Sequence, residues 1–131
     1  MIHGIGHDVL EIKRLSLLLS GQLGYRFMER VLTEKEREEA RRRGGKLTEF
    51  VAGRFAAKEA ISKAFGCGIG SIIGFADMEI LPDSWGRPVA SLSPGAWERL
   101  QLPGEPDYII HLTISHQTEL ASAFAVVERT V

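Results

Sequence analysis

The sequence predicts a single α+β domain over residues 1–131, with a helical N-terminal half and a long central helix packed on a largely antiparallel sheet. Three observations predict this fold class. The first half contains several helix-capping signals, apolar residues follow helical spacing between Thr48 and Gly66, and short alternating apolar segments with turn residues follow Ile72. With 44% hydrophobic residues, the chain is long enough to bury one core.

The first element is predicted to be a short strand over residues 3–9, where Gly4 and Gly6 allow another backbone or a ligand to approach closely. Asp8 lies where this strand ends. With Glu11 three residues later, Asp8 fits the N-cap of a following helix in a pattern like the capping box. A carboxylate at a strand end beside glycines is also well placed to hold a hard metal ion, and both interpretations are open.

Two further short helices are expected between that helix and the central one. A turn leads to a helix over residues 25–32, and Thr33 with Glu36 then forms a capping box for a highly charged helix that ends before Gly44. Three arginines in its last turn suit the negative end of the helix dipole.

The central helix is predicted to start after Thr48, its N-cap, and to end at Gly66, which provides a left-handed stop. The glycine-rich loop over residues 66–70 lacks the Gly-Lys-Ser/Thr ending of a P-loop, and it follows a helix instead of preceding one. It therefore does not predict a P-loop, although Gly66 remains a candidate ligand contact.

Charges on the central helix fall in an unusual place. Arg54 and Lys58 share an arc with Phe50, and burying two cations beside aromatic rings is costly unless they are paired or reach an anion. An anionic partner would satisfy both. Alternatively their aliphatic stems extend past the aromatic rings to water, while Glu59 and Lys63 form a surface ion pair on the opposite side. Periodicity alone favours this second interpretation.

The C-terminal half is predicted to contain four strands, over residues 76–81, 87–92, 108–115 and 120–128. A short helix over residues 93–100 separates the second strand from the third, with Ser93 as its cap and Pro94 at its first position. Residues 116–119 are expected to connect the last two strands as a hairpin.

Charge is distributed unevenly along the chain. Residues 13–63 carry thirteen Lys or Arg against seven Asp or Glu, whereas the remainder carries three against ten. This asymmetry favours an acidic or phosphate-rich partner, and we expect no nucleic-acid partner because the acidic part would repel a long polyanion. We also expect no membrane span and a cytoplasmic location, since the sequence contains no cationic leader, no long apolar run and only one cysteine, Cys67.

Four motifs occur in order: Gly4-Ile5-Gly6-His7-Asp8; Arg54-Phe55-Ala56-Ala57-Lys58-Glu59-Ala60 with Lys63-Ala64-Phe65-Gly66; Gly86-Arg87-Pro88; and Thr113-Ile114-Ser115-His116. Together they resemble the holo-[acyl-carrier-protein] synthase family, the small bacterial class of 4′-phosphopantetheinyl transferases. The resemblance extends over nearly the whole chain. It implies the fold of these transferases and transfer of the phosphopantetheine arm of coenzyme A to a serine of apo acyl carrier protein, in support of fatty acid biosynthesis.

The resemblance also implies a set of catalytic and ligand-binding residues. Asp8 and Glu59 would bind Mg²⁺ together with coenzyme A pyrophosphate oxygens and water, which suits the preference of Mg²⁺ for a few carboxylates plus phosphates. A Mg²⁺-bound water oriented by either carboxylate would accept the serine proton. Lys63 would lie near the pyrophosphate, and Arg54 and Lys58 are candidates for other coenzyme A phosphate contacts.

Two further positions are expected to contact coenzyme A. Gly66 belongs to the matching motif at the end of the central helix. The resemblance places His116 near the nucleotide or its 3′-phosphate, and the alternative is a hairpin histidine that bonds to its own turn.

The basic N-terminal helices are expected to meet the acidic carrier protein. Positions that match docking residues of the family are Arg14, Gln22, Arg26, Phe27 and Arg30, with Lys13 as a lesser candidate. Members of the family form trimers with active sites between protomers, so the resemblance implies a homotrimer. His7 and Arg87 depart from the residues that the family commonly has at these positions.

An alternative function of another class is a noncatalytic module that binds nucleotides or acidic proteins through the same basic face. It predicts that alanine at Asp8 and Glu59 leaves binding intact. RNA binding through Arg41-Arg42-Arg43 is a further alternative, but the sequence contains no recognisable single-strand platform.

Overall fold

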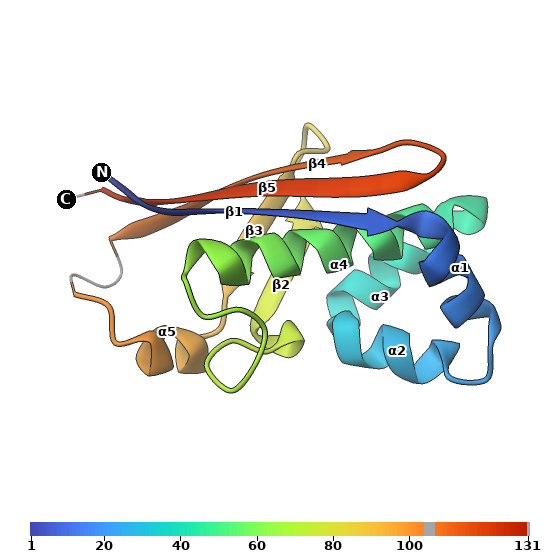
Figure 1. The fold of residues 1–131 in the computed structure, drawn as a ribbon, viewed down its shortest axis with the longest axis horizontal. Coiled ribbons are helices and arrows are strands. Elements are labelled where there is room, and N and C mark those ends of the chain that lie inside the picture. The colour runs from blue at the N-terminus through green and yellow to red at the C-terminus, as the bar shows by residue number, and fades with distance from the viewer. Residues whose placement is uncertain (104–106, 131) are drawn as a thin grey trace.

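The structure, a computed structural model, describes residues 1–103 and 107–130 (Figure 1). Its elements are β1 (Ile2–Glu11), α1 (Ile12–Ser20), α2 (Gly24–Val31), α3 (Glu34–Arg41), α4 (Leu47–Ala64), β2 (Met78–Pro82), β3 (Pro88–Leu92), α5 (Pro94–Leu100), β4 (Tyr108–His116) and β5 (Leu120–Arg129). Short 3₁₀ turns lie at Gly44–Lys46 and Phe75–Asp77. The predicted α+β class is confirmed.

The strands form two antiparallel sheets instead of one meander. One sheet has the order β1-β5-β4, and β2 pairs with β3 in a separate hairpin. The first strand therefore pairs with the last. In Figure 1, α4 runs along the three-stranded sheet, and α1, α2 and α3 gather near one end of this layer.

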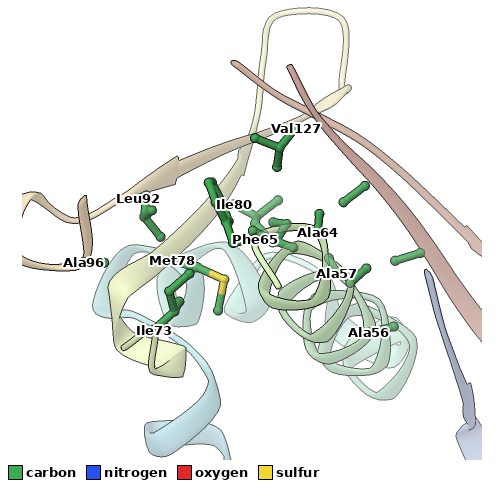
Figure 2. Packing of buried hydrophobic residues seen from close by; sticks show 14 of the residues in the cluster. Ala56, Ala57, Ala64, Phe65, Ile73, Met78, Ile80, Leu92, Ala96 and Val127 are labelled. Atoms are coloured by element: carbon green, nitrogen blue, oxygen red, sulfur yellow. The ribbon is translucent and has the colours of Figure 1, made fainter. Parts of the chain in front are cut away.

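Small side chains let the sheet and α4 pack closely. Every second residue of β5 faces the helix and is buried, from Ala121 to Val127, while α4 contributes buried alanines at residues 56, 57, 60 and 64. Larger side chains from β2, β3 and the loop before β2 complete this cluster, among them Ile73, Met78 and Ile80 (Figure 2). A second cluster joins the first turns of α4 to α1, α2 and α3.

The other face of the three-stranded sheet carries exposed apolar side chains. The side chains point away from α4 because strand residues alternate between faces. They include Ile5 and Val9 on β1, Leu120 and Phe124 on β5, and Ile109 on β4. Ile5 is 60% exposed and Phe124 is 42% exposed, so this face presents an apolar surface in the single chain.

Two predicted helix caps were wrong. Asp8 lies within β1, and α1 begins at Ile12 with no side-chain hydrogen bond at its N-cap. Strand pairing keeps Asp8 extended, since it lies opposite Ala123 of β5. Thr48 is not an N-cap either, because the 3₁₀ turn at Gly44–Lys46 leads directly into α4.

Three other local signals are confirmed. Thr33 and Glu36 form the capping box of α3, and the Ser93 side chain accepts a hydrogen bond from the backbone of Ala96 at the start of α5. Gly66 has a φ of 85° just after α4, a left-handed conformation that glycine adopts without strain. No helix within the described ranges is both long and apolar enough to cross a lipid bilayer.

Candidate active site

Two glycines bring β1 directly onto the backbone of α4. A Cβ atom at Gly6 would overlap the carbonyl oxygen of Ala60, and one at Gly4 would overlap that of Ala64. The expectation of close approach at these glycines is confirmed, and the approaching group is another backbone. Because side chains alternate along a strand, Asp8 projects toward the same helix.

Asp8, Glu59 and Lys63 form the centre of the candidate site. Lys63 Nζ lies 3.1 Å from Asp8 Oδ1 and also donates a hydrogen bond to the carbonyl oxygen of His7 at 3.2 Å. Glu59 lies one helical turn before Lys63, on the same face of α4. The structure therefore brings Asp8 together with Glu59 and Lys63, the other two predicted catalytic residues, which follow it by more than fifty residues.

Charge and burial both act on Glu59. Partial burial raises the pKa of the Glu59 carboxyl above its ordinary value, the nearby negative charge of Asp8 raises it further, and the Lys63 ammonium opposes both effects. Two carboxylates that repel each other in this way are stabilised by any cation that binds between them.

The two carboxylates fit a Mg²⁺ ion. Within the described ranges, no cluster of three or more His, Cys, Asp or Glu residues has the geometry of a metal site. Asp8 and Glu59 thus provide a sparse, oxygen-only pair. Mg²⁺ is commonly held by one or two carboxylates together with substrate phosphates and water, so this donor set suits it better than it suits zinc.

The structure contradicts the prediction that Lys58 contacts coenzyme A. Its side chain is fully buried, and Nζ lies 2.6 Å from both Glu36 Oε1 and the carbonyl oxygen of Val31 and 3.1 Å from that of Phe75. The three acceptors match the three donors of an ammonium group, so no donor is left for a phosphate. The alternative, that the Lys58 side chain extends past the aromatic rings to water, is wrong as well.

Arg54 is also buried, but it borders a pocket. Its Nε donates to the carbonyl oxygen of Ile80 at 3.2 Å, and its guanidinium carbon lies 4.3 Å from the centre of the Phe50 ring. Burial is the main cause that lowers its pKa to about 10, so the guanidinium stays charged at neutral pH. A buried cation on a pocket wall favours an anionic occupant.

The pocket beside Arg54 has a volume of about 260 Å³. It is lined by Arg43, Lys46, Glu49, Phe50, Gly53, Arg54, Gly86, Pro88, Ile114 and His116. The His116 side chain is 49% exposed, and its Nδ1 lies 3.5 Å from Glu49 Oε2. His116 therefore faces α4 across the pocket, together with part of the Gly86-Arg87-Pro88 motif.

Sequence reasoning missed Arg43 and Lys46 as pocket residues. Both precede α4, and the three arginines of the predicted helix end were explained by the helix dipole alone. The surplus of cations just before the central motif was the feature of the sequence that could have predicted these pocket residues. By contrast, Arg87 does not line the pocket, since its Nε lies 3.0 Å from Asp83 Oδ2 within the β2–β3 turn.

The pocket and the carboxylate pair lie on different faces of α4. Successive residues of an α-helix are rotated by about 100° around its axis. Lys63 therefore lies roughly half a turn around the axis from Arg54, and Glu59 lies about 140° from Arg54. The three-stranded sheet lies along α4 as well (Figure 1). Within one chain, the two groups of residues are therefore separated by the body of the helix.

The candidate docking residues are mostly exposed. Arg14 on α1 and Arg26 and Arg30 on α2 are exposed, as is Gln22 in the connection between these helices. Phe27 differs from them, because its ring stacks on Phe55 at a centroid distance of 5.9 Å and is partly buried. Phe27 thus contributes to packing between α2 and α4 in the single chain.

Gly66 is exposed at the end of α4, and a Cβ at this position would meet no atom within 4 Å. Its backbone nitrogen donates to the carbonyl oxygen of Lys63 at 2.9 Å. Conformation therefore accounts for glycine here, and a ligand contact at Gly66 stays a prediction.

Comparison with known proteins shows which proteins this chain is related to. The family model described as the 4′-phosphopantetheinyl transferase superfamily matches residues 4–125. A holo-[acyl-carrier-protein] synthase of Bacillus cereus is 48% identical over 129 residues, which cover 98% of this chain and 97% of the relative.

Solved structures show the same relationship. A holo-(acyl-carrier-protein) synthase from Bacillus anthracis, in complex with CoA (3′,5′-ADP), is 46% identical with a TM-score of 0.81, covering 98% of this chain and 97% of that one. The holo-[acyl-carrier-protein] synthase from Neisseria meningitidis is 34% identical with a TM-score of 0.85, and the matched regions cover 98% and 99% of the two chains.

Proposed function

Because this chain belongs to the 4′-phosphopantetheinyl transferase superfamily, we propose that it transfers the 4′-phosphopantetheine arm of coenzyme A to a serine of apo acyl carrier protein. The products are holo acyl carrier protein and adenosine 3′,5′-bisphosphate. The chain is similar over nearly its full length to holo-[acyl-carrier-protein] synthases, one of them in complex with CoA (3′,5′-ADP). The convergence of Asp8, Glu59 and Lys63 is the observation in this chain that carries the proposal.

The reaction exchanges one phosphorus–oxygen bond for another. The serine Oγ of the carrier protein bonds to the phosphorus that bears the pantetheine arm, and the bond from this phosphorus to the bridging pyrophosphate oxygen breaks. Asp8 and Glu59 orient the water that takes the serine proton. The Lys63 ammonium stabilises the negative charge that develops on the leaving bisphosphate.

Mg²⁺ is the metal ion that we assign to Asp8 and Glu59. When bound, it supplies Lewis-acid stabilisation of the pyrophosphate oxygens. The carboxylate-only donor set supports this assignment. Asp8 comes from a strand that pairs with β5, and Glu59 comes from the largely buried central helix, so both ligands are held by packed elements.

The nucleotide end of coenzyme A is assigned to the pocket between Arg54 and His116. Arg54, Lys46 and Arg43 supply positive charge there for the phosphates of the bisphosphate, and Pro88 and Ile114 supply apolar walls. His116 lies at the pocket rim with its exposed imidazole able to reach a phosphate.

We assign the active enzyme to a homotrimer in which each site lies between two protomers. The carboxylate pair and the nucleotide pocket lie on different faces of α4, so one coenzyme A molecule contacts both most directly when they come from neighbouring chains. The exposed apolar face of the three-stranded sheet provides a surface that such an assembly can bury.

The acidic carrier protein is assigned to the exposed basic surface of α1 and α2. Arg14, Arg26 and Arg30 project from these helices, and charge complementarity of this kind mainly sets the encounter rate and the orientation of the partner. Among the described residues, none of the three forms an ion pair, so their charges are available to a partner. We place the reaction in the cytoplasm, in fatty acid biosynthesis, where the free Cys67 thiol suits a reducing compartment.

Intact-protein mass spectrometry tests the function. Apo acyl carrier protein is incubated with this protein, coenzyme A and Mg²⁺, and parallel samples contain a chelator or the Asp8→Asn variant. The expected result is a mass gain of one phosphopantetheine arm that is lost in both parallel samples. Glu11→Gln, which removes an exposed carboxylate from the same strand, is the matched control and should retain transfer. Absence of any mass gain with folded protein and several carrier proteins would leave a noncatalytic binding module.

A further inference from the structure

The Lys63 ammonium is bound to the same carboxylate that we assign to the metal. Its Nζ lies 3.1 Å from Asp8 Oδ1, and it donates to the carbonyl oxygen of His7 at 3.2 Å. Both acceptors belong to β1, whereas Lys63 belongs to the last turn of α4. The ammonium thus bridges strand and helix at the centre of the site.

A divalent cation at Asp8 would have to share this carboxylate with Lys63. Mg²⁺ lies about 2.1 Å from its oxygen ligands. An ion at that distance from Asp8 would come within roughly 4–5 Å of the Lys63 ammonium in its present position, and two cations at this separation repel each other. Lys63 therefore opposes metal binding as long as it remains on Asp8.

Lys63 is nevertheless able to leave Asp8. Its side chain is 48% exposed, in contrast to 17% for Asp8, so the ammonium can be hydrated without disturbing the core. Ion pairs of such exposure are weak, and the four-carbon stem of lysine is flexible. An anion that carries more charge than one carboxylate would attract the ammonium away from Asp8. A pyrophosphate on the same side of α4 is such an anion.

We propose that Lys63 couples the binding of the two ligands: it neutralises Asp8 in the free protein and moves to the pyrophosphate of coenzyme A, which releases Asp8 to the metal. This inference rests on the proposed function, because it takes coenzyme A and a divalent cation as ligands of the site. Its thermodynamic consequence is reciprocal, since each ligand raises the affinity for the other by the same factor. The free protein accordingly binds the metal weakly.

Mn²⁺ is the probe, because it shares the preference of Mg²⁺ for oxygen ligands and its free concentration can be measured by electron paramagnetic resonance. Mn²⁺ affinity is measured for the wild type and for Lys63→Met, each without and with coenzyme A and without carrier protein. The complex that coenzyme A itself forms with Mn²⁺ is measured in protein-free samples and subtracted. Thermal unfolding checks that the variant is folded.

The expected result is a rise of about fivefold or more in the Mn²⁺ affinity of the free protein on Lys63→Met. The factor by which coenzyme A increases Mn²⁺ affinity should become smaller in the same variant. Lys35→Met is the matched control, because it removes one exposed positive charge from α3 and should change neither quantity.

Two other outcomes overturn the inference and are distinguishable. If Lys63→Met binds Mn²⁺ no tighter than the wild type, while coenzyme A still raises Mn²⁺ affinity by an unchanged factor, Lys63 does not couple the ligands and the transferase function stands. If neither protein binds Mn²⁺ with or without coenzyme A, the metal-dependent function fails together with the coupling.

Discussion

Glu59 shows how a residue that we propose for the reaction can oppose folding. Its pKa is raised by burial and by the charge of Asp8, so the folded state holds the Glu59 proton more tightly than the unfolded state does. The stabilising contribution is therefore complete below the unfolded pKa of about 4.3 and is lost as pH rises through the folded pKa. At neutral pH, without metal, ionised Glu59 destabilises the fold.

Glu59→Gln is accordingly expected to raise the melting temperature at pH 7 by a few degrees in the absence of metal, and to abolish transfer. Near pH 4 the difference in melting temperature should shrink, because the wild-type carboxyl is then protonated. Differential scanning calorimetry in the two buffers measures both values. Glu11→Gln should give no comparable gain, and an equal or lower melting temperature for Glu59→Gln at pH 7 would contradict the argument.

At the scale of elements, the crossing of β1 over α4 determines where the carboxylates of Asp8 and Glu59 meet. The strand can lie on the helix backbone only where it lacks side chains, at Gly4 and Gly6. On the opposite side of α4, the buried ion pair of Lys58 with Glu36 joins the helix to α3, and Glu36 also accepts a hydrogen bond from Ile80 of β2. These two contacts fix α4 from both sides.

Gly6→Ala should destabilise the protein by about 1–3 kcal/mol, because its Cβ would overlap the Ala60 carbonyl oxygen and force strand and helix apart. Urea unfolding measures this loss. Gly70→Ala is the matched control, since a Cβ there would meet no atom within 4 Å, and its effect should stay within about 0.5 kcal/mol. Equal stabilities of the two variants would show that the crossing tolerates a side chain.

Lys58→Met should lower the free energy of unfolding by about 3–5 kcal/mol, because Glu36 would be left buried without its cation. Glu36→Gln should lower the free energy of unfolding less in this variant than in the wild type, since the two residues interact directly. Urea unfolding of the four proteins in the cold tests this non-additivity.

Measuring coenzyme A binding distinguishes a structural role of Lys58 from the ligand contact that the sequence predicted. At a temperature where Lys58→Met is folded, its KM for coenzyme A should equal that of the wild type. A KM increase of tenfold or more in folded protein would restore Lys58 as a ligand contact.

At the scale of the whole molecule, the division of the site between two faces of α4 has a direct consequence for mixed assemblies. Asp8→Asn retains the nucleotide pocket, whereas a Lys46→Ala/His116→Ala variant retains the carboxylate pair. When the two inactive variants are refolded together, some neighbouring protomers combine an intact pocket with an intact carboxylate pair.

In an equal mixture, about a quarter of the composite sites are intact, so roughly that fraction of wild-type transfer should return at low coenzyme A concentration. Each variant refolded alone serves as the control. Light scattering after size-exclusion chromatography checks that the mixed protein has the mass of a trimer. Recovery of no activity in mixed trimers would place both halves of each site within one protomer.

The sequence by itself determined the α+β class, most element positions, the capping box of α3 and the stop at Gly66. Through the family resemblance it also predicted Asp8, Glu59 and Lys63 as catalytic residues, and the structure brings these three side chains together. These features depend on neighbouring residues or on motifs with fixed spacing, so they can be read without knowing what packs against them. The resemblance stated from four motifs was confirmed by the comparisons.

Only the tertiary structure decided that Arg54 and Lys58 have different surroundings. Both lie on the same arc of one helix, and helical periodicity cannot tell which of them meets an acidic residue from a distant element. Lys58 donates a hydrogen bond to Glu36, which lies twenty-two residues earlier in the chain, while Arg54 borders an open pocket. The pairing of β1 with β5 was likewise beyond sequence reasoning, because such long-range contacts depend on how the completed elements pack together and not on local preference.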